Sequence, residues 1–153
     1  MRFTIDCNIL VYALDSGTPE KHRIASDLMI RAAMLDAVLT SQVLAEFLNV
    51  IRRKYPAHLD SALEQAKRWV TLFPVGATSA EHVLKGAAFA ERYRLQLWDS
   101  IIWQVASDMH AAVFLSEDLQ DGLSVDGMTV IDPFNPGNDE RLAQLLGSSS
   151  QRD

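Results

Sequence analysis

Cysteine is almost absent from this chain of 153 residues, which carries a single one, Cys7. One cysteine excludes an internal disulfide and a cysteine-based zinc cluster, and it favours a reducing, cytoplasmic setting. Glycine and proline are also scarce, at 7 and 5 residues, so the composition is not that of a fibrous or disordered chain. With 48% hydrophobic and 22% charged residues, the sequence predicts a globular protein whose apolar core needs no metal or disulfide for its stability.

Long apolar runs and an excess of positive charge are lacking as well. The chain has no run of roughly 18 apolar residues, and its first residues reach the carboxylate of Asp6 too early for the apolar region of a secretion signal. We therefore expect neither a membrane span nor secretion. The 14 Lys and Arg against 20 Asp and Glu give a net charge of −6, the wrong sign for binding nucleic acid by phosphate neutralisation alone. A polyanionic substrate would need another source of positive charge.

Short apolar segments alternate along the chain with longer segments of helical periodicity. The predicted strands cover residues 3–5, 37–40, 73–77, 111–115 and 129–131. The predicted helices follow Thr18, Ser41 and Ser79 as N-caps and also cover about 59–72 and 98–109. This alternation predicts an α/β fold in which helices cover both faces of a mostly parallel sheet.

The chain shows no internal repeat and no linker between domains. We expect a single domain over residues 1–146, followed by a disordered, serine-rich tail over 147–153. The first strand is expected to run out into a turn around Asp6 and Asn8, since polar residues interrupt the apolar pattern there.

Acidic residues follow the predicted strand ends, where ligands of a parallel sheet bind. Asp6 ends the first strand, Glu46 lies in the helix after the second, Asp99 begins the helix before the strand 111–115, and Asp118 follows that strand. Each aspartate also has an ordinary role open to it, as a turn or helix-cap residue. Glu46 fits such a role less well, because it lies at the edge of an apolar helix face with no basic residue one turn away.

Carboxylates gathered at one edge of a sheet repel one another and raise each other's pKa unless a cation lies among them. Oxygen ligands select a hard cation, which makes Mg²⁺ the expected ion and Mn²⁺ the alternative. Such an ion also connects an acidic pocket to a phosphate group. It would therefore resolve the conflict between the negative net charge and a polyanionic substrate.

Four segments carry a resemblance to a known family: FTIDCNILVYA (3–13), TSQVLAEFLNV (40–50), LWDSII (97–102) and LSEDLQDG (115–122). In this order they resemble the PIN-domain family, and within it the VapC-like toxin ribonucleases of type II toxin–antitoxin systems. The resemblance extends from residue 1 to about 134. It implies a three-layer α/β/α sandwich with a mostly parallel sheet, a metal-dependent endoribonuclease acting on RNA, a homodimer, and an antitoxin protein that blocks the site.

The resemblance also assigns roles to individual residues. It implies catalytic acids at Asp6, Glu46, Asp99 and Asp118, of which Asp6, Asp99 and Asp118 would bind the metal. Asn8 and Ser116 match polar positions that support such a site, and Asp121 is a further acid expected near the metal.

The remaining candidates are weaker. Arg92 and Arg94 precede Asp99 and are candidate contacts to RNA phosphate, whereas the basic run 52–54 is explained by its place at a helix C-terminus. Cys7 is expected to be a small core residue, and the tryptophans are expected to form core and interface area. Two other functions remain open: a DNA-directed or structure-specific nuclease of the same fold, and a non-catalytic protein-interaction module that retains the acids.

Overall fold

A mixed sheet with the strand order β3-β2-β1-β4-β6-β5 forms the centre of the protein in a computed structural model that describes residues 1–147. The strands are β1 (Phe3–Ile5), β2 (Ala37–Thr40), β3 (Val75–Gly76), β4 (Val113–Leu115), β5 (Ser124–Val125) and β6 (Met128–Ile131). The helices are α1 (Cys7–Leu14), α2 (Pro19–Ala32), α3 (Ser41–Lys54), α4 (Leu59–Leu72), α5 (Ala80–Tyr93), α6 (Leu97–Asp108) and α7 (Asp139–Leu146), with 3-10 turns at Pro56–His58 and Pro136–Asn138.

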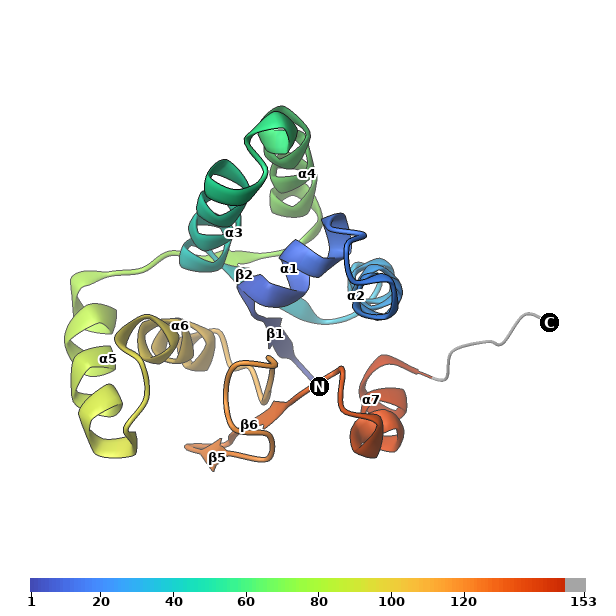
Figure 1. The fold of residues 1–153 in the computed structure, drawn as a ribbon. Coiled ribbons are helices and arrows are strands. Elements are labelled where there is room, and N and C mark those ends of the chain that lie inside the picture. Colours follow the sequence, from blue (N-terminus) through green and yellow to red (C-terminus); the bar gives the residue numbers. More distant parts are fainter. Residues whose placement is uncertain (148–153) are drawn as a thin grey trace.

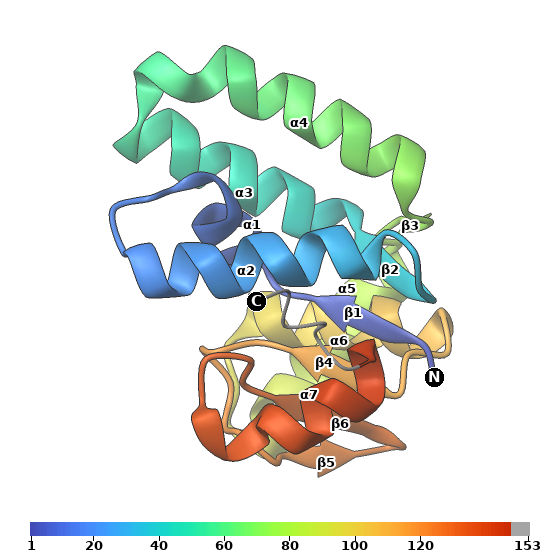
Figure 2. The same ribbon diagram turned by 90° about the vertical axis from the view of Figure 1, so that its right-hand side faces the viewer.

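Helices lie on both sides of the sheet. Figure 1 shows α5 and α6 on one side and α1, α2 and α7 on the other, which confirms the three-layer arrangement. Figure 2 shows α4 as the outermost helix, with α3 between it and the rest of the molecule. None of the helices in the described residues is long and apolar enough to cross a membrane. The tail predicted to be disordered lies, apart from Gly147, outside the described residues.

The central strand β1 lies between two parallel neighbours that the chain reaches in opposite directions. Phe3 pairs with Ala37 of β2 on one side and with Val113 of β4 on the other. The chain moves outward from β1 to β2 and β3, and then returns through α5 and α6 to β4. The strand order therefore reverses between β1 and β4, and the carboxyl ends of these strands border the crevice where α/β proteins place ligands.

The structure has a helix, α1, where the sequence predicted a turn after the first strand. The helix begins at Cys7, directly after β1, and Asp6 is its N-cap, with a carboxylate that accepts a hydrogen bond from the Cys7 backbone N–H at 2.7 Å. Ile9 and Leu10 of this helix are fully buried. The polar residues near the strand end thus begin a helix, because an aspartate side chain can replace the missing carbonyl partner of a first-turn N–H.

Two further elements differ from the expectation. Helix α3 is capped by Thr40, whose hydroxyl accepts from the Val43 N–H at 3.2 Å, and its predicted cap Ser41 is the first helical residue. Strand β5 pairs antiparallel with β6 across a turn at Asp126 and Gly127, which have φ of 49° and 83°. An Asp-Gly pair favours such hairpin turns, so the sequence carries a signal for the extra strand.

Large apolar side chains fill the space between the layers. Trp103 of α6 packs between Phe89 of α5 and Phe114 of β4, with ring centroids 5.4 and 5.8 Å apart. Trp69 of α4 meets Phe47 of α3 edge to face at 4.9 Å. Cys7 is buried, as expected of a small core residue. Only two of the three tryptophans belong to this core, because Trp98 at the start of α6 is 61% exposed.

Candidate active site

The four acids singled out from the sequence line one cavity of about 380 Å³ at the carboxyl ends of β1 and β4. Asp6 comes from the end of β1, Glu46 from α3, Asp99 from the first turn of α6, and Asp118 from the loop after β4. A wider cleft of about 960 Å³ also has Glu46, Asp99 and Asp118 in its wall. Residues that are distant in the sequence therefore share one pocket, which opens into a larger cleft.

Ser116 connects two of these acids across the sheet. Asp6 is only 2% exposed, and its Oδ2 accepts a hydrogen bond from the Ser116 hydroxyl at 2.6 Å. The same hydroxyl oxygen accepts from the Asp118 backbone N–H at 3.1 Å. Because Ser116 directly follows β4, it fixes the loop that carries Asp118 beside the carboxylate at the end of β1.

Gln42 orients the acids on the opposite wall. Its Nε2 donates to Glu46 Oε1 at 2.9 Å and to the Trp98 backbone carbonyl at 2.9 Å. The side chain therefore joins α3 to the residue before Asp99 at the start of α6. Sequence reasoning did not single out Gln42, although its spacing of four residues from Glu46 was a usable signal for contact on one helix face.

The pocket destabilises negative charge. Burial raises the pKa of Asp6 to about 7, opposed by the hydrogen bond from Ser116 and increased again by the charge of Asp99. Burial also raises the pKa of Asp99 to about 6, with the charges of Glu46 and Asp118 adding to the effect. The Cys7 thiol has its pKa raised by burial and by the surrounding carboxylates, so it is a poor nucleophile at neutral pH.

The donor set fits a hard divalent cation. Carboxylate oxygens are the ligands that Mg²⁺ and Mn²⁺ prefer, and a cation would offset both the burial and the mutual repulsion that raise these pKa values. Asn8 also lines the smaller cavity, and its Oδ1 and Nδ2 are buried with no hydrogen-bond partner among the described residues. Within residues 1–147 no three His, Cys, Asp or Glu side chains are grouped closely enough to hold an ion as they stand.

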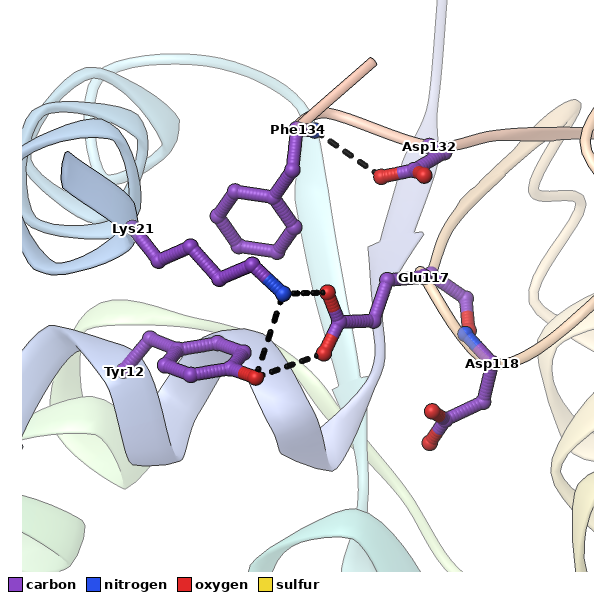
Figure 3. A network of polar contacts seen from close by, with 7 residues as sticks. Tyr12, Lys21, Glu117, Asp118, Asp132 and Phe134 are labelled. Atoms are coloured by element: carbon purple, nitrogen blue, oxygen red, sulfur yellow. Dashed lines mark hydrogen bonds and ion pairs between the residues drawn. The ribbon is translucent and has the colours of Figure 1, made fainter. Parts of the chain in front are cut away.

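A polar network formed with side chains of α1 and α2 supports the loop that carries Asp118. Lys21 of α2 donates to Glu117 Oε2 at 2.6 Å, and the Tyr12 hydroxyl donates to Glu117 Oε1 at 2.7 Å. The Lys21 ammonium also lies 4.9 Å from the Tyr12 ring centroid and 5.3 Å from that of Phe134. Figure 3 shows Glu117 pointing into this network and its neighbour Asp118 pointing away from it. The Glu117 charge is thus neutralised outside the acidic pocket.

We expect Lys21→Met to lower the free energy of unfolding by about 1–2 kcal/mol, because it leaves a partly buried carboxylate without its cation and removes a cation–π contact. The side chains of Lys21 and Glu117 are 35% and 18% exposed. Lys67→Met is the matched control, since the pair of Lys67 with Glu64 is largely exposed and should contribute nothing measurable. Urea unfolding of both variants measures the difference. Equal stabilities would show that the network does not stabilise the fold.

Of the three weaker candidates, Arg94 lies at the cleft, whereas Arg92 and Asp121 lie away from both cavities. Arg94 lies in the wall of the wider cleft, whereas Arg92 lies over the Tyr93 ring at 5.3 Å and lines neither cavity. Asp121 accepts hydrogen bonds from the Asp132 N–H at 3.0 Å and from Asn138 Nδ2 at 2.9 Å. Its carboxylate holds the turn before α7 and lines neither cavity, so its placement near a metal remains a prediction.

A family model described as the PIN domain matches residues 3–120. The chain belongs to the PIN-domain family. This confirms the family resemblance and, with the observed layers, the predicted fold class. A search of curated protein sequences finds no match.

Solved structures share the PIN fold with this domain at low sequence identity. VapC20 of Mycobacterium tuberculosis, described as a Sarcin-Ricin loop cleaving toxin, is 15% identical with a TM-score of 0.62, over 73% of this chain and 86% of that one. A toxin–antitoxin complex from Klebsiella pneumoniae is 19% identical with a TM-score of 0.60, over 86% and 97% of the chains. VapBC2 from Rickettsia felis, bound to a DNA fragment from its promoter, is 16% identical with a TM-score of 0.60, over 85% and 97%.

Proposed function

We propose that this PIN domain is a metal-dependent endoribonuclease that acts as the toxin of a toxin–antitoxin pair. The observation that carries the proposal is the meeting of Asp6, Glu46, Asp99 and Asp118 in one cavity at the point where the strand order reverses. The description of the M. tuberculosis neighbour as a toxin that cleaves the Sarcin-Ricin loop supports RNA as the substrate class. Cytoplasmic location is part of the same proposal.

The proposed chemistry is hydrolysis of an RNA phosphodiester. When bound, Mg²⁺ or Mn²⁺ supplies Lewis acidity toward the phosphoryl oxygens and lowers the pKa of the attacking water. Asp6, Asp99 and Asp118 would hold the ion, and the amide of Asn8, which has no partner in the described residues, would hydrogen-bond a water molecule in the same cavity. Glu46, oriented by Gln42, would accept the proton of the attacking water. Ser116 would hold Asp6 and the backbone of Asp118 in position through its two hydrogen bonds.

Cleavage of a mixed RNA pool should require a divalent cation. We expect purified protein to fragment the pool with Mg²⁺, to lose activity in EDTA, and to recover when Mg²⁺ is restored in excess. Mapping the fragment ends identifies the target. Single-stranded and duplex DNA serve as the matched substrates. Cleavage of DNA in preference to RNA would favour the DNA-directed nuclease, and no cleavage of either substrate would favour the non-catalytic protein-interaction module.

A protein partner and a homodimer belong to the same proposal. Exposed apolar side chains occur at the end of α2, at Ile30 and Met34, and along α4, at Leu63, Val70 and Leu72. Groups of exposed apolar residues of this kind are typical of protein interfaces. The Klebsiella neighbour is a toxin–antitoxin complex, which supports an antitoxin as one occupant. Light scattering of the purified protein, alone and with its partner, measures the two assemblies.

A further inference from the structure

Trp98 is an exposed aromatic residue at the edge of the acidic site. It directly precedes Asp99, and 61% of it is accessible to solvent, whereas Trp69 and Trp103 are buried. Trp98 lines the wider cleft, together with Glu46, Asp99 and Asp118. A large ring exposed to water beside a cluster of carboxylates contributes little to the core, and most of its surface is free to contact a ligand in the cleft.

The backbone that carries this ring is fixed. Gln42 Nε2 donates to the Trp98 carbonyl, and the Ser100 N–H donates to the Gln96 carbonyl at 3.0 Å. Ser100 is fully buried and packs in the first turn of α6. The ring therefore projects from a rigid helix start, which limits the conformational entropy lost when a flat ligand stacks on it.

The rest of the cleft wall carries the groups that recognise nucleobases. Amide side chains, which offer both donors and acceptors to base edges, come from Asn49, Gln96 and Gln120. Gln42 also lines the cleft, and because its Nε2 already donates to Glu46 and Trp98, it offers only its Oε1 as an acceptor. Arg94, which follows α5 in the left-handed conformation with φ of 55°, is the one cationic residue in this wall among the described residues. One cation beside three carboxylates does not favour a backbone of phosphates along the whole cleft. The wall instead suits a base, with a single phosphate near Arg94.

We propose that Trp98 is the stacking platform for one unpaired nucleobase next to the scissile phosphate, with the surrounding amides reading its edge. The inference rests on the proposed ribonuclease function and adds a requirement to it. A base can lie on the Trp98 ring only when it is out of a duplex stack, so the substrate must be single-stranded at this position. Loops and unpaired segments of structured RNA meet this requirement.

Binding of a single-stranded RNA oligomer to the Asp6→Asn protein tests the platform without cleavage. We expect the oligomer to quench the emission of Trp98, since the other two tryptophans are buried, and an oligomer of the same length without bases to leave that emission largely unchanged. Trp98→Leu in the same background should weaken binding between about 5-fold and 150-fold, and Trp98→Phe should retain most of the affinity. Leu84→Ala removes an even more exposed apolar side chain, on α5 and outside the cleft, and should bind like the parent.

Turnover gives a second, independent measurement. In the otherwise unaltered protein, Trp98→Leu should raise KM for single-stranded RNA while Trp98→Phe stays close to the parent, because stacking holds both ground state and transition state. Equal quenching by the oligomer without bases, or unchanged affinity of Trp98→Leu, would overturn the platform. A change in Trp98 emission that depends on protein concentration without RNA would also overturn the platform. It would show that the ring contacts a second copy of the chain.

The two proposals fail separately. Quenching by RNA in a protein that cleaves nothing with Mg²⁺ would refute the nuclease and leave the base platform intact. Cleavage that depends on Mg²⁺ with no quenching and no effect of Trp98→Leu would refute the platform and leave the nuclease intact.

Discussion

Asp6→Asn should reduce Mg²⁺-dependent RNA cleavage by at least about 100-fold, because loss of an outer-shell partner alone costs a metal site 10- to 100-fold and Asp6 is proposed as a direct ligand. Its carboxylate is the most deeply buried of the acids and lies at the end of β1 between the other elements of the site. An amide has one oxygen and no charge, so it is a much weaker ligand for a divalent cation than the carboxylate. Initial rates with saturating Mg²⁺ measure the loss.

The same substitution should leave the fold intact. Asn has nearly the shape of Asp, and its oxygen can still accept the hydrogen bond from the Cys7 N–H that begins α1. The exchange also removes a buried charge whose pKa is raised to about 7. In EDTA near pH 8, the variant should therefore unfold at a temperature equal to or above that of the parent. A variant that is both inactive and unfolded would say nothing specific about metal binding, so circular dichroism accompanies the assay.

Asp121→Asn is the contrasting substitution, because Asp121 is an acid that lines neither cavity. Although burial raises the pKa of Asp121, hydrogen bonds from the Asp132 N–H, Asn138 and Asn135 lower it overall, so its charge is stabilised where it stands. Because Asp121 is exposed and water screens its charge, removing that charge should lower stability by about 0.5–1 kcal/mol and leave cleavage largely unaltered. Loss of cleavage in Asp121→Asn with unaltered stability would instead place Asp121 at the metal.

The positions of the acids were predictable because they depend on local patterns and on one general rule. Short buried strands at 3–5, 37–40 and near 113–115 are evident from their apolar runs, and the carboxyl ends of parallel strands meet at one edge. A residue that follows such a strand is therefore placed by topology alone. Glu46 required one further step, its place at the boundary of the apolar face of a helix.

Contacts between distant segments were not predictable in the same way. Lys21 meets Glu117 across 96 positions of sequence, and nothing local to either residue indicates the pair. The exposure of Trp98 depends on where α6 begins relative to α3, which the helical period does not determine. Helix α1 was missed for a different reason: aspartate and asparagine favour both turns and helix starts, and only the burial of Ile9 and Leu10 decides between them.

Stability of the metal-free protein should fall as the pH rises from about 4 to about 7. The ordinary pKa of Asp6 is 3.8, and burial raises it to about 7 in the folded protein, so the folded state keeps a proton that the unfolded state has released. Stability falls with pH wherever the folded state binds more protons, and each pKa unit corresponds to about 1.4 kcal/mol, which sets a ceiling of about 4 kcal/mol for Asp6. Asp99, with its pKa raised to about 6, acts in the same direction over a narrower range.

Mg²⁺ should reverse this loss, since the ion binds the deprotonated carboxylates of the folded state. A concentration 100 times the Kd adds about 2.7 kcal/mol to the free energy of unfolding, and the gain should grow with pH because protons and the ion compete for the same oxygens. Urea unfolding from pH 4 to pH 8, in EDTA and in excess Mg²⁺, measures both effects. Asp6→Asn should flatten the EDTA profile and remove most of the Mg²⁺ effect. Parallel plots of stability against pH for the parent and Asp6→Asn would contradict the raised pKa of Asp6. An Mg²⁺ effect that survives the substitution would show that the ion binds away from the end of β1.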